Sequence, residues 1–195
     1  MKPTKFETAL ALIDKKNTED PNVYSVNGVK FPKELLYSQR MTRKLLQFKP
    51  NATEALQIAS RAQHICRWEI ARDTYPMDRI GYLKWREDLK KMHAQITAEI
   101  LKTVGYDNAF IDEVTLLITK KLIKKNTDSQ TLEDVVCLVF LEYYFEEFAE
   151  KHHEEKVVDI LKKTWVKMSD EGHAKALKTK FSKMGLALVE QALKE

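Results

Sequence analysis

Apolar residues recur at helical spacing over most of the chain, and residues 3–14 already place Phe6, Leu10 and Ile13 on one side of a short helix. Further helices are predicted over residues 32–48, 51–66, 88–104, 107–119, 132–151, 154–168, 170–178 and 182–194. Only five Gly and five Pro occur among 195 residues, too few for the turns of a β-sandwich or barrel. The pattern predicts an all-α protein: a single-domain bundle of about eight helices.

Between the first two helices, residues 14–28 are polar and contain Pro21 and the turn signal Asn27-Gly28. We therefore predict an N-terminal helix with a polar linker or wrap at 1–28 and a helical domain at 29–195. The longest apolar run, Val135–Leu141, is too short to span a bilayer and predicts a buried helix. The first residues do not resemble a signal peptide, so we expect a cytoplasmic protein with no membrane partner.

Charge and cysteine content exclude little. Lys and Arg total 33 against 29 Asp and Glu, a net charge of +4, which is too small to indicate nucleic-acid binding by itself. The two cysteines, Cys66 and Cys137, lie in apolar helical patterns without CxxC spacing. They predict neither a disulfide framework nor a zinc site.

Two histidines lie on helices that the pattern makes central. His64 follows a stripe of small residues in RAQHICRWE, and His93 lies on the apolar stripe of its own helix. Either could be a core histidine that is merely hydrogen-bonded. Together they could bind a divalent metal or move protons. With Glu69, which stands in the same charged segment as His64, they are the candidate catalytic residues.

The segment 67–86 is dense in Arg and aromatic residues. Arg binds planar oxyanions through two hydrogen bonds, and aromatic rings can stack on a base or sugar. The candidate substrate-binding residues are Arg61, Arg67, Arg72, Tyr75, Arg79, Trp85, Arg86, Lys90 and Lys121. The same segment could instead be an ordered loop fixed by Arg–carboxylate pairs, or a site for a nucleic-acid strand.

Two charged residues stand in apolar registers. Lys121 follows Val114 and Leu117 at helical spacing, and Glu142 directly follows the apolar run that ends at Leu141. A buried charge needs a partner, so we expect both at the edge of the core, paired with each other, an arginine, a metal or a ligand. For Lys121, the alternative is a side chain that reaches solvent from a helix end.

Several motifs resemble an uncharacterised family, that of the domain of unknown function 4202. They are YSQRM at 37–41, RAQHICRWEIARDTYPMDR at 61–79, GYLKWREDLKKMHA at 81–94 and TLEDVVCLVFLEYYF at 131–145. The resemblance covers nearly the whole chain after residue 30 and implies no established activity.

A more remote resemblance is to the HD superfamily of helical metal-dependent phosphohydrolases. Tyr37 stands in the place of the first metal-binding His, His64 is kept, Ile65 replaces the adjacent Asp, and His93 matches a later His. Lys121 falls near another His place and Glu142 near the final Asp. The resemblance implies one divalent metal ion held by His64, His93 and a carboxylate such as Glu142, or a metal-free pocket in which Lys121 supplies the charge.

These observations together predict an HD-like phosphohydrolase, or a binder of a phosphorylated small molecule such as a nucleotide. One alternative is a ligand sensor that uses the same pocket without catalysis. Another is an RNA-binding module that uses residues 67–86, in keeping with a basic pI near 8.9. Bound metal would favour an enzyme, and salt-dependent RNA binding would favour the RNA module.

Overall fold

The computed structural model describes residues 2–194 and confirms the all-α class, with one small β-hairpin as its sheet. The chain divides into two compact units, Met1–Lys121 and Leu122–Glu195, and each is described by itself. No helix in residues 2–194 is long and apolar enough to cross a membrane.

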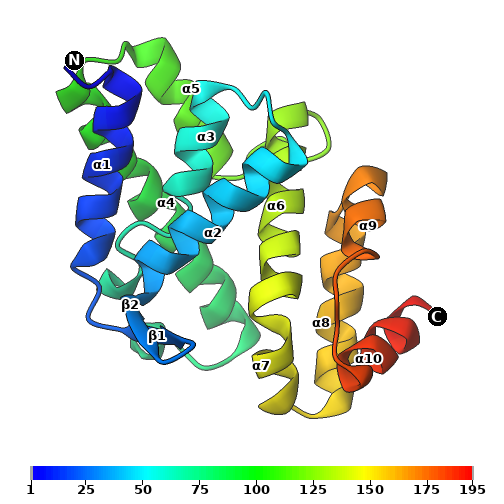
Figure 1. The fold of residues 1–195 in the computed structure, drawn as a ribbon. Helices are drawn as coiled ribbons and strands as arrows, with labels where there is room; N and C mark the ends of the chain where they lie inside the picture. Colours follow the sequence, from blue (N-terminus) through cyan, green and yellow to red (C-terminus); the bar gives the residue numbers. More distant parts are fainter. Residues whose placement is uncertain (1, 195) are drawn as a thin grey trace. The chain divides into compact units, whose positions relative to one another are not determined.

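The first unit contains helices α1 to α5 and the hairpin (Figure 1). The elements are α1 (Lys5–Thr18), β1 (Val23–Val26), β2 (Val29–Pro32), α2 (Lys33–Phe48), α3 (Glu54–Arg61), α4 (Arg79–Val104) and α5 (Asn108–Ile118). Two short 3-10 turns, Arg67–Glu69 and Arg72–Thr74, lie between α3 and α4.

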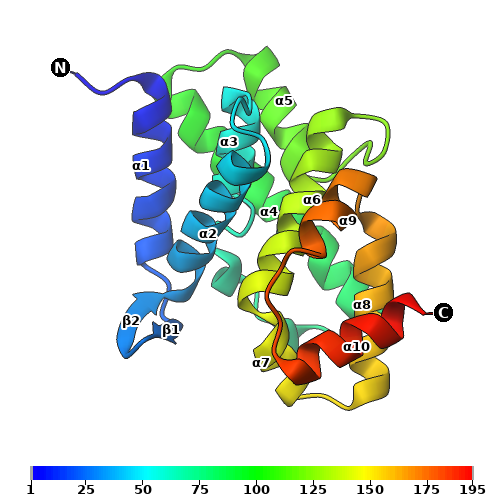
Figure 2. The same ribbon diagram turned by 45° about the vertical axis from the view of Figure 1, so that its right-hand side comes forward.

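Helix α3 lies at the centre of this unit and contacts α1, α2 and α5. Its stripe of small residues explains this place, because Ala55, Ala59 and Ala62 are almost fully buried and let neighbouring helices approach closely. Helix α4 packs against α1 and α5, and the hairpin packs against α2. Figures 1 and 2 show α1 and α2 beside α3 in both views.

Two local expectations in this unit need correction. Residues 23–32 form an antiparallel hairpin that begins in the predicted linker and crosses the predicted boundary at residue 28, and the Asn27-Gly28 signal supplies its turn with φ values of 50° and 81°. Helix α4 begins at Arg79 rather than at residue 88. Gly81 lies in its first turn, where the Gly81 N–H donates to the N-cap carboxylate of Asp78 at 2.7 Å.

Gly81 also lets the loop before α4 lie against the helix. A Cβ at this position would stand 2.1 Å from the Pro76 carbonyl oxygen, so Gly81→Ala must displace backbone. We expect this variant to lose about 2 kcal/mol of unfolding free energy in urea denaturation. Lys84→Ala, at an exposed position of the same helix, is the control. Equal stability of the two variants would contradict the close packing of this loop.

The second unit contains α6 (Thr127–Tyr143), α7 (Phe145–Glu150), α8 (Glu154–Lys167), α9 (Asp170–Ala176) and α10 (Lys183–Leu193). Helix α6 contacts α7, α8 and α9, and α10 contacts α7 and α8 (Figure 2). The apolar run on α6 is almost entirely buried, as expected. The helix begins at Thr127 rather than Leu132, because Asn126 caps it by accepting the N–H of Ser129.

Buried or half-buried carboxylates hold the starts of the last two helices. Asp134 on α6 accepts the backbone N–H of Ser169, the N-cap of α9, at 2.7 Å and its hydroxyl at 2.6 Å. Glu146 on α7 does the same for Ser182, the N-cap of α10, at 2.7 and 2.8 Å. The four-residue pattern Ser-x-x-Gly therefore recurs at 169–172 and 182–185, with a carboxylate on the cap each time.

Candidate functional site

A hydrogen-bonded chain of Glu34, His64 and Arg67 forms the centre of the candidate site in the first unit. His64 Nδ1 lies 3.2 Å from Glu34 Oε2, and Arg67 Nη1 lies 3.1 Å from His64 Nε2. Arg67 Nε is also 4.0 Å from Glu34 Oε1. The His64 side chain is 26% exposed and that of Glu34 only 7%. A buried carboxylate thus stands behind an imidazole that solvent can reach.

The partners of His64 fix its tautomer. A guanidinium can only donate hydrogen bonds, so His64 Nε2 must accept from Arg67. The ring proton of the neutral imidazole is therefore on Nδ1 and is donated to Glu34, which accepts it as a carboxylate. This leaves the basic lone pair of His64 on Nε2, the atom that faces Arg67.

Aromatic side chains hold the imidazole and the guanidinium in place. The Tyr37 ring stacks on His64 with a centroid separation of 4.0 Å and an interplanar angle of 9°. The Arg67 guanidinium carbon lies 4.8 Å from the centroid of the Trp85 ring. Trp85 is itself buried and donates its indole N–H to Ile70 O at 2.9 Å. Stacking of this kind limits the rotation of both polar groups.

His93 stands behind this chain in the core. It is 2% exposed, and its ring centroid is 6.0 Å from that of His64, so the two histidines lie close together. His93 Nδ1 donates to Ile65 O at 2.7 Å, while Nε2 has no hydrogen-bond partner among the described residues. Burial, followed by the charge of His64, lowers the pKa of His93 to about 3.

Local backbone structure places the central residues. The Asp20 carboxylate accepts the backbone N–H of Glu34 at 2.9 Å and so secures the first turn of α2. After α3 the chain reverses at Cys66, whose φ of 53° lies in the left-handed region. Cys66 N donates to the buried Asn17 on α1 at 3.2 Å, which supports this costly conformation. The reversal puts His64 and Arg67 on the same side of the turn.

Positive charge surrounds His64. Burial lowers the pKa of His64 well below its usual value, and the charges of Arg67, Lys120, Arg86 and Lys33 lower it further. The imidazole is therefore neutral at neutral pH. Burial raises the pKa of Glu34, and the charges of Arg67 and Lys33 oppose that shift.

Other predicted residues have structural partners. Arg61 pairs with Asp14 through two hydrogen bonds of 2.7 and 2.5 Å, and so ties α3 to α1. Arg72 donates to the backbone oxygens of Tyr75, Pro76 and Asp78, and the Tyr75 hydroxyl donates to Asp88 at 3.0 Å. Residues 67–78 are therefore an ordered loop with two 3-10 turns, whereas residues 79–86 belong to α4. Arg72 fixes the loop through carbonyl groups rather than the expected carboxylates.

Several further candidates lie on the surface. Glu69 and Arg79 are exposed, and Lys90 pairs with Glu87 at 2.5 Å. Arg86 is half-buried, donates to the Tyr82 hydroxyl at 3.2 Å, and adds its charge to the field at His64. Near His64, the carboxylate is Glu34 rather than Glu69.

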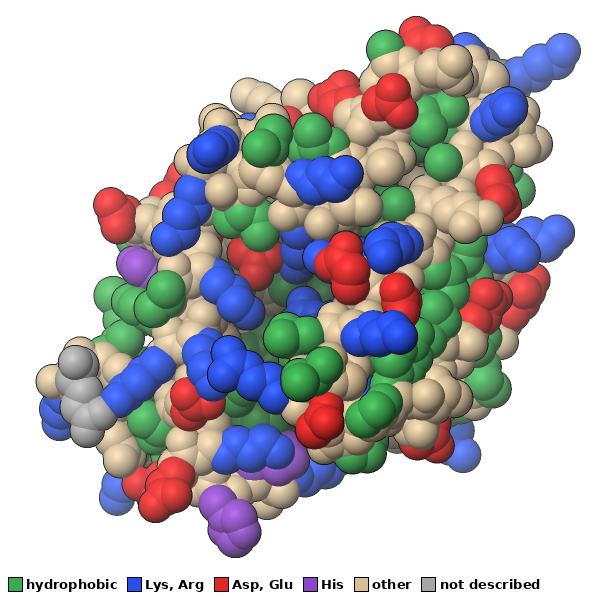
Figure 3. Space-filling view, turned by 180° about the vertical axis from the view of Figure 1, so that it is seen from behind, with side chains coloured by type: hydrophobic (Ala, Val, Ile, Leu, Met, Phe, Trp, Pro, Cys, Tyr) green, Lys and Arg blue, Asp and Glu red, His purple; other side chains and the backbone are tan. Residues whose placement is uncertain are grey.

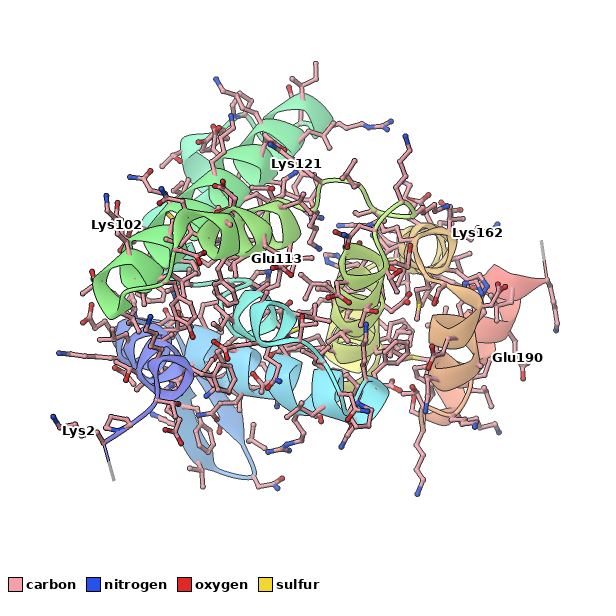
Figure 4. The ribbon with its side chains drawn as sticks, turned by 90° about the horizontal axis from the view of Figure 1, so that it is seen from above. Lys2, Lys102, Glu113, Lys121, Lys162 and Glu190 are labelled. Carbon is pink, nitrogen blue, oxygen red and sulfur yellow. The ribbon has the colours of Figure 1, made fainter. Side chains whose placement is uncertain are left out.

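Lys121 and Glu142 do not lie at the edge of the core, where the sequence pattern places them. Both residues are exposed, and Figure 4 shows Lys121 beyond the C-terminal end of α5. Helix α5 ends at Ile118 and Lys120 has a left-handed φ of 56°, so helical spacing no longer applies to Lys121. It is Lys120 whose charge acts on His64. Glu142 lies on the solvent side of α6, in the second unit.

The donor set around the histidines does not fit a resident metal ion. Both ring nitrogens of His64 already have partners in Glu34 and Arg67, and Nδ1 of His93 is taken by Ile65 O. Across residues 2–194, no group of three His, Cys, Asp or Glu side chains is placed to hold a metal. These contacts give no support to the expected metal site of His64, His93 and Glu142, which stays an untested prediction.

Sequence reasoning missed three residues of this site: Glu34, Lys33 and Lys120. Glu34 stands in the first turn of a helix, where acidic residues are common for reasons unrelated to function. Lys33 and Lys120 belong to a lysine-rich chain in which nothing distinguishes them. Tyr37 carried a signal through its motif, but its stacking on His64 could not be foreseen.

Comparison with known protein families gives one finding. Residues 7–189 match the family described as Domain of unknown function (DUF4202). No curated protein and no solved structure matches the chain.

Proposed function

The chain belongs to the DUF4202 family, whose description names no activity, and from the geometry of the first unit we propose that it binds a phosphorylated small molecule, such as a nucleotide, and hydrolyses its phosphate ester. The phosphoryl group would bind against His64 and Arg67. The protein would then be an HD-like phosphohydrolase whose own side chains, and not a metal ion, carry out the chemistry.

The observation that carries the proposal is the charge around His64. A neutral, partly exposed imidazole lies in the field of Arg67, Lys120, Arg86 and Lys33. An anionic ligand would relieve the repulsion among these cations, and a guanidinium binds phosphoryl oxygens through two parallel hydrogen bonds. Developing negative charge on a phosphoryl group would be stabilised by the same groups.

The chain offers a base for the reaction. When Arg67 turns to the phosphoryl oxygens, His64 Nε2 is released with its lone pair available. Glu34 keeps the proton on Nδ1 and stabilises the positive charge that the ring gains as it reacts. Tyr37 holds the ring plane. Tyr37, His64 and His93 follow one another in the order that the HD resemblance implies, and their rings lie close together in the structure. Both facts support the HD-like hypothesis.

The proposal is tested by titrating inorganic phosphate and a set of nucleoside monophosphates into the protein by isothermal titration calorimetry. We expect at least one to bind, and Arg67→Ala to raise its Kd at least 10-fold, the expected loss of about 1.4 kcal/mol for a charged hydrogen bond. Arg43→Ala, on the exposed side of α2, should leave the Kd unchanged. Equal effects of both variants, or no binding, would refute the site.

Two outcomes would favour the rival functions. Binding without phosphate release would indicate a sensor. Tight binding of a single-stranded RNA oligonucleotide that weakens steeply with salt would indicate an RNA module. Figure 3 shows Lys and Arg side chains interspersed with Asp and Glu.

A further inference from the structure

We propose that His64 Nε2 is itself phosphorylated, so that phosphoryl transfer passes through a covalent phosphohistidine. This inference rests on the proposed function and specifies which atom attacks phosphorus. It adds a modification site to the chain, with a phosphate monoester or another small phosphorylated compound as the donor.

Of the two neighbouring histidines, only His64 is arranged as a nucleophile. Its proton is on Nδ1 and is held by Glu34, so the lone pair is on Nε2 and the ring cannot turn without breaking two hydrogen bonds and the stack on Tyr37. The side chain is 26% exposed. His93 is 2% exposed, so a phosphoryl group could not reach it without opening the core.

The position of Arg67 favours direct attack over activation of a water. Its Nη1 lies 3.1 Å from His64 Nε2, so a phosphoryl oxygen that takes over this N–H brings its phosphorus next to the same nitrogen. A water between imidazole and phosphorus would need roughly one further hydrogen-bond length. Because the Arg67 side chain is 30% exposed and rests on the face of Trp85, the guanidinium can exchange partners while it stays stacked.

The reaction has two steps, transfer of the phosphoryl group to His64 and hydrolysis of the phosphohistidine. In the first, the Nε2 lone pair forms the N–P bond while the P–O bond to the leaving group breaks. The leaving oxygen keeps the bonding electrons and takes a proton from solvent. The ring retains its Nδ1 proton, and Glu34 offsets its positive charge. In the second, water attacks phosphorus, the N–P electrons return to Nε2, and the water proton passes to solvent, leaving an alcohol and inorganic phosphate.

Surrounding charge suits this intermediate. A phosphoryl group on Nε2 would lie where the charges of Arg67, Lys120 and Arg86 act. Glu34 is buried on the opposite nitrogen and is kept from the phosphoryl oxygens by the ring itself. The repulsion between carboxylate and phosphate, which would oppose transfer, is thus reduced by the placement of the two groups at opposite ends of the imidazole.

The experiment incubates the full-length protein with acetyl phosphate, quenches it in alkaline denaturant, where an N–P bond survives, and measures the intact mass. We expect the addition of one phosphoryl group, mapped to His64 by peptide sequencing and lost on acid treatment. His64→Gln should abolish it. His153→Gln, at an exposed position in the second unit, should retain it. A label retained in His64→Gln would overturn the proposal.

A second experiment tests for a phosphohistidine that is hydrolysed too quickly to accumulate. A phosphorothioate monoester made chiral by its sulfur and two oxygen isotopes, hydrolysed in water of the third isotope, gives retention at phosphorus if two displacements occur, and inversion if water attacks directly. Retention supports the phosphohistidine and inversion overturns it. Inversion together with a raised Kd in Arg67→Ala would leave the proposed binding and hydrolysis standing. Absence of both binding and label would refute both proposals.

Discussion

Acidification from pH 7 to pH 5 is expected to remove about 2 kcal/mol of unfolding free energy through His93 alone. In the unfolded chain His93 has its ordinary pKa of 6.5, whereas burial lowers the pKa to about 3 in the folded protein. Between these values the unfolded state binds more protons, so stability falls as the pH falls, by up to about 1.4 kcal/mol per pH unit. Protonation of the folded state would add a buried N–H at Nε2 with no acceptor among the described residues.

Neighbouring groups modify this dependence in known directions. His64 adds to the loss, because its pKa is also lowered and its stabilising effect also declines below pH 6.5. Glu34 opposes this loss of stability. Its pKa is raised in the folded protein, so at pH values between 4.5 and the raised pKa the folded state binds more protons than the unfolded state. Arg67 keeps its charge throughout this range. The two histidines thus lower the stability as the pH falls, and Glu34 acts in the opposite direction.

The pH effect is measured by urea denaturation at several pH values. His93→Gln keeps a side chain of similar size but does not titrate. It should therefore lower the slope of unfolding free energy against pH by nearly the amount that the binding of one proton contributes. His153→Gln, at an exposed position, is the control. An NMR titration of the His93 ring in the unaltered protein gives a second measurement that does not depend on the variant folding. Protonation of that ring above pH 5 would contradict the prediction.

The variant Asp134→Ala is expected to lose about 3 kcal/mol of unfolding free energy. Asp134 is 1% exposed and accepts three hydrogen bonds: the backbone N–H and the hydroxyl of Ser169, and the Gln130 amide at 3.2 Å. Removing the carboxylate leaves these donors without that acceptor and loosens the N-cap of α9. A buried polar group that loses its partner is penalised in full, so the effect should be large.

The control for this prediction is Asp159→Ala on α8. Asp159 pairs with Lys163 at 2.5 Å, but both side chains are more than half exposed, so its removal should change stability by less than about 0.5 kcal/mol. Urea denaturation compares the variants, and hydrogen exchange of the α9 amides localises the effect. A loss in Asp134→Ala no larger than in Asp159→Ala would show that this carboxylate does not hold α9.

Local patterns correctly indicated most helices. The helix ends at Gly105 and Ser182 were placed correctly because Gly at a left-handed C-cap and Ser at an N-cap act within a few residues. The hairpin at 23–32 was missed although its turn was recognised, because strands of four residues carry too short an alternation to identify. The sequence places the start of α6 at residue 132 rather than Thr127, because the first turn after Asn126 is polar and carries no apolar periodicity.

The candidate site was recovered in part for a different reason. His64, His93 and Arg67 could be identified because histidine and arginine are common in binding and catalytic sites. The structure brings all three together. Glu34 lies 30 residues before His64, and nothing local links them. Lys121 was favoured over Lys120 because helical spacing was continued past Ile118, where the helix has already ended.

The sequence by itself determined that the protein is helical, which faces of its helices are apolar and which titratable residues stand on them, because helix periodicity and capping depend on neighbours along the chain. Only the tertiary structure decided which charges meet. The pairing of Glu34 with His64, of Arg61 with Asp14 and of Asp134 with Ser169 depends on contacts between distant segments. The free energy of a buried polar group depends on the partner it finds there, and no local pattern records that partner.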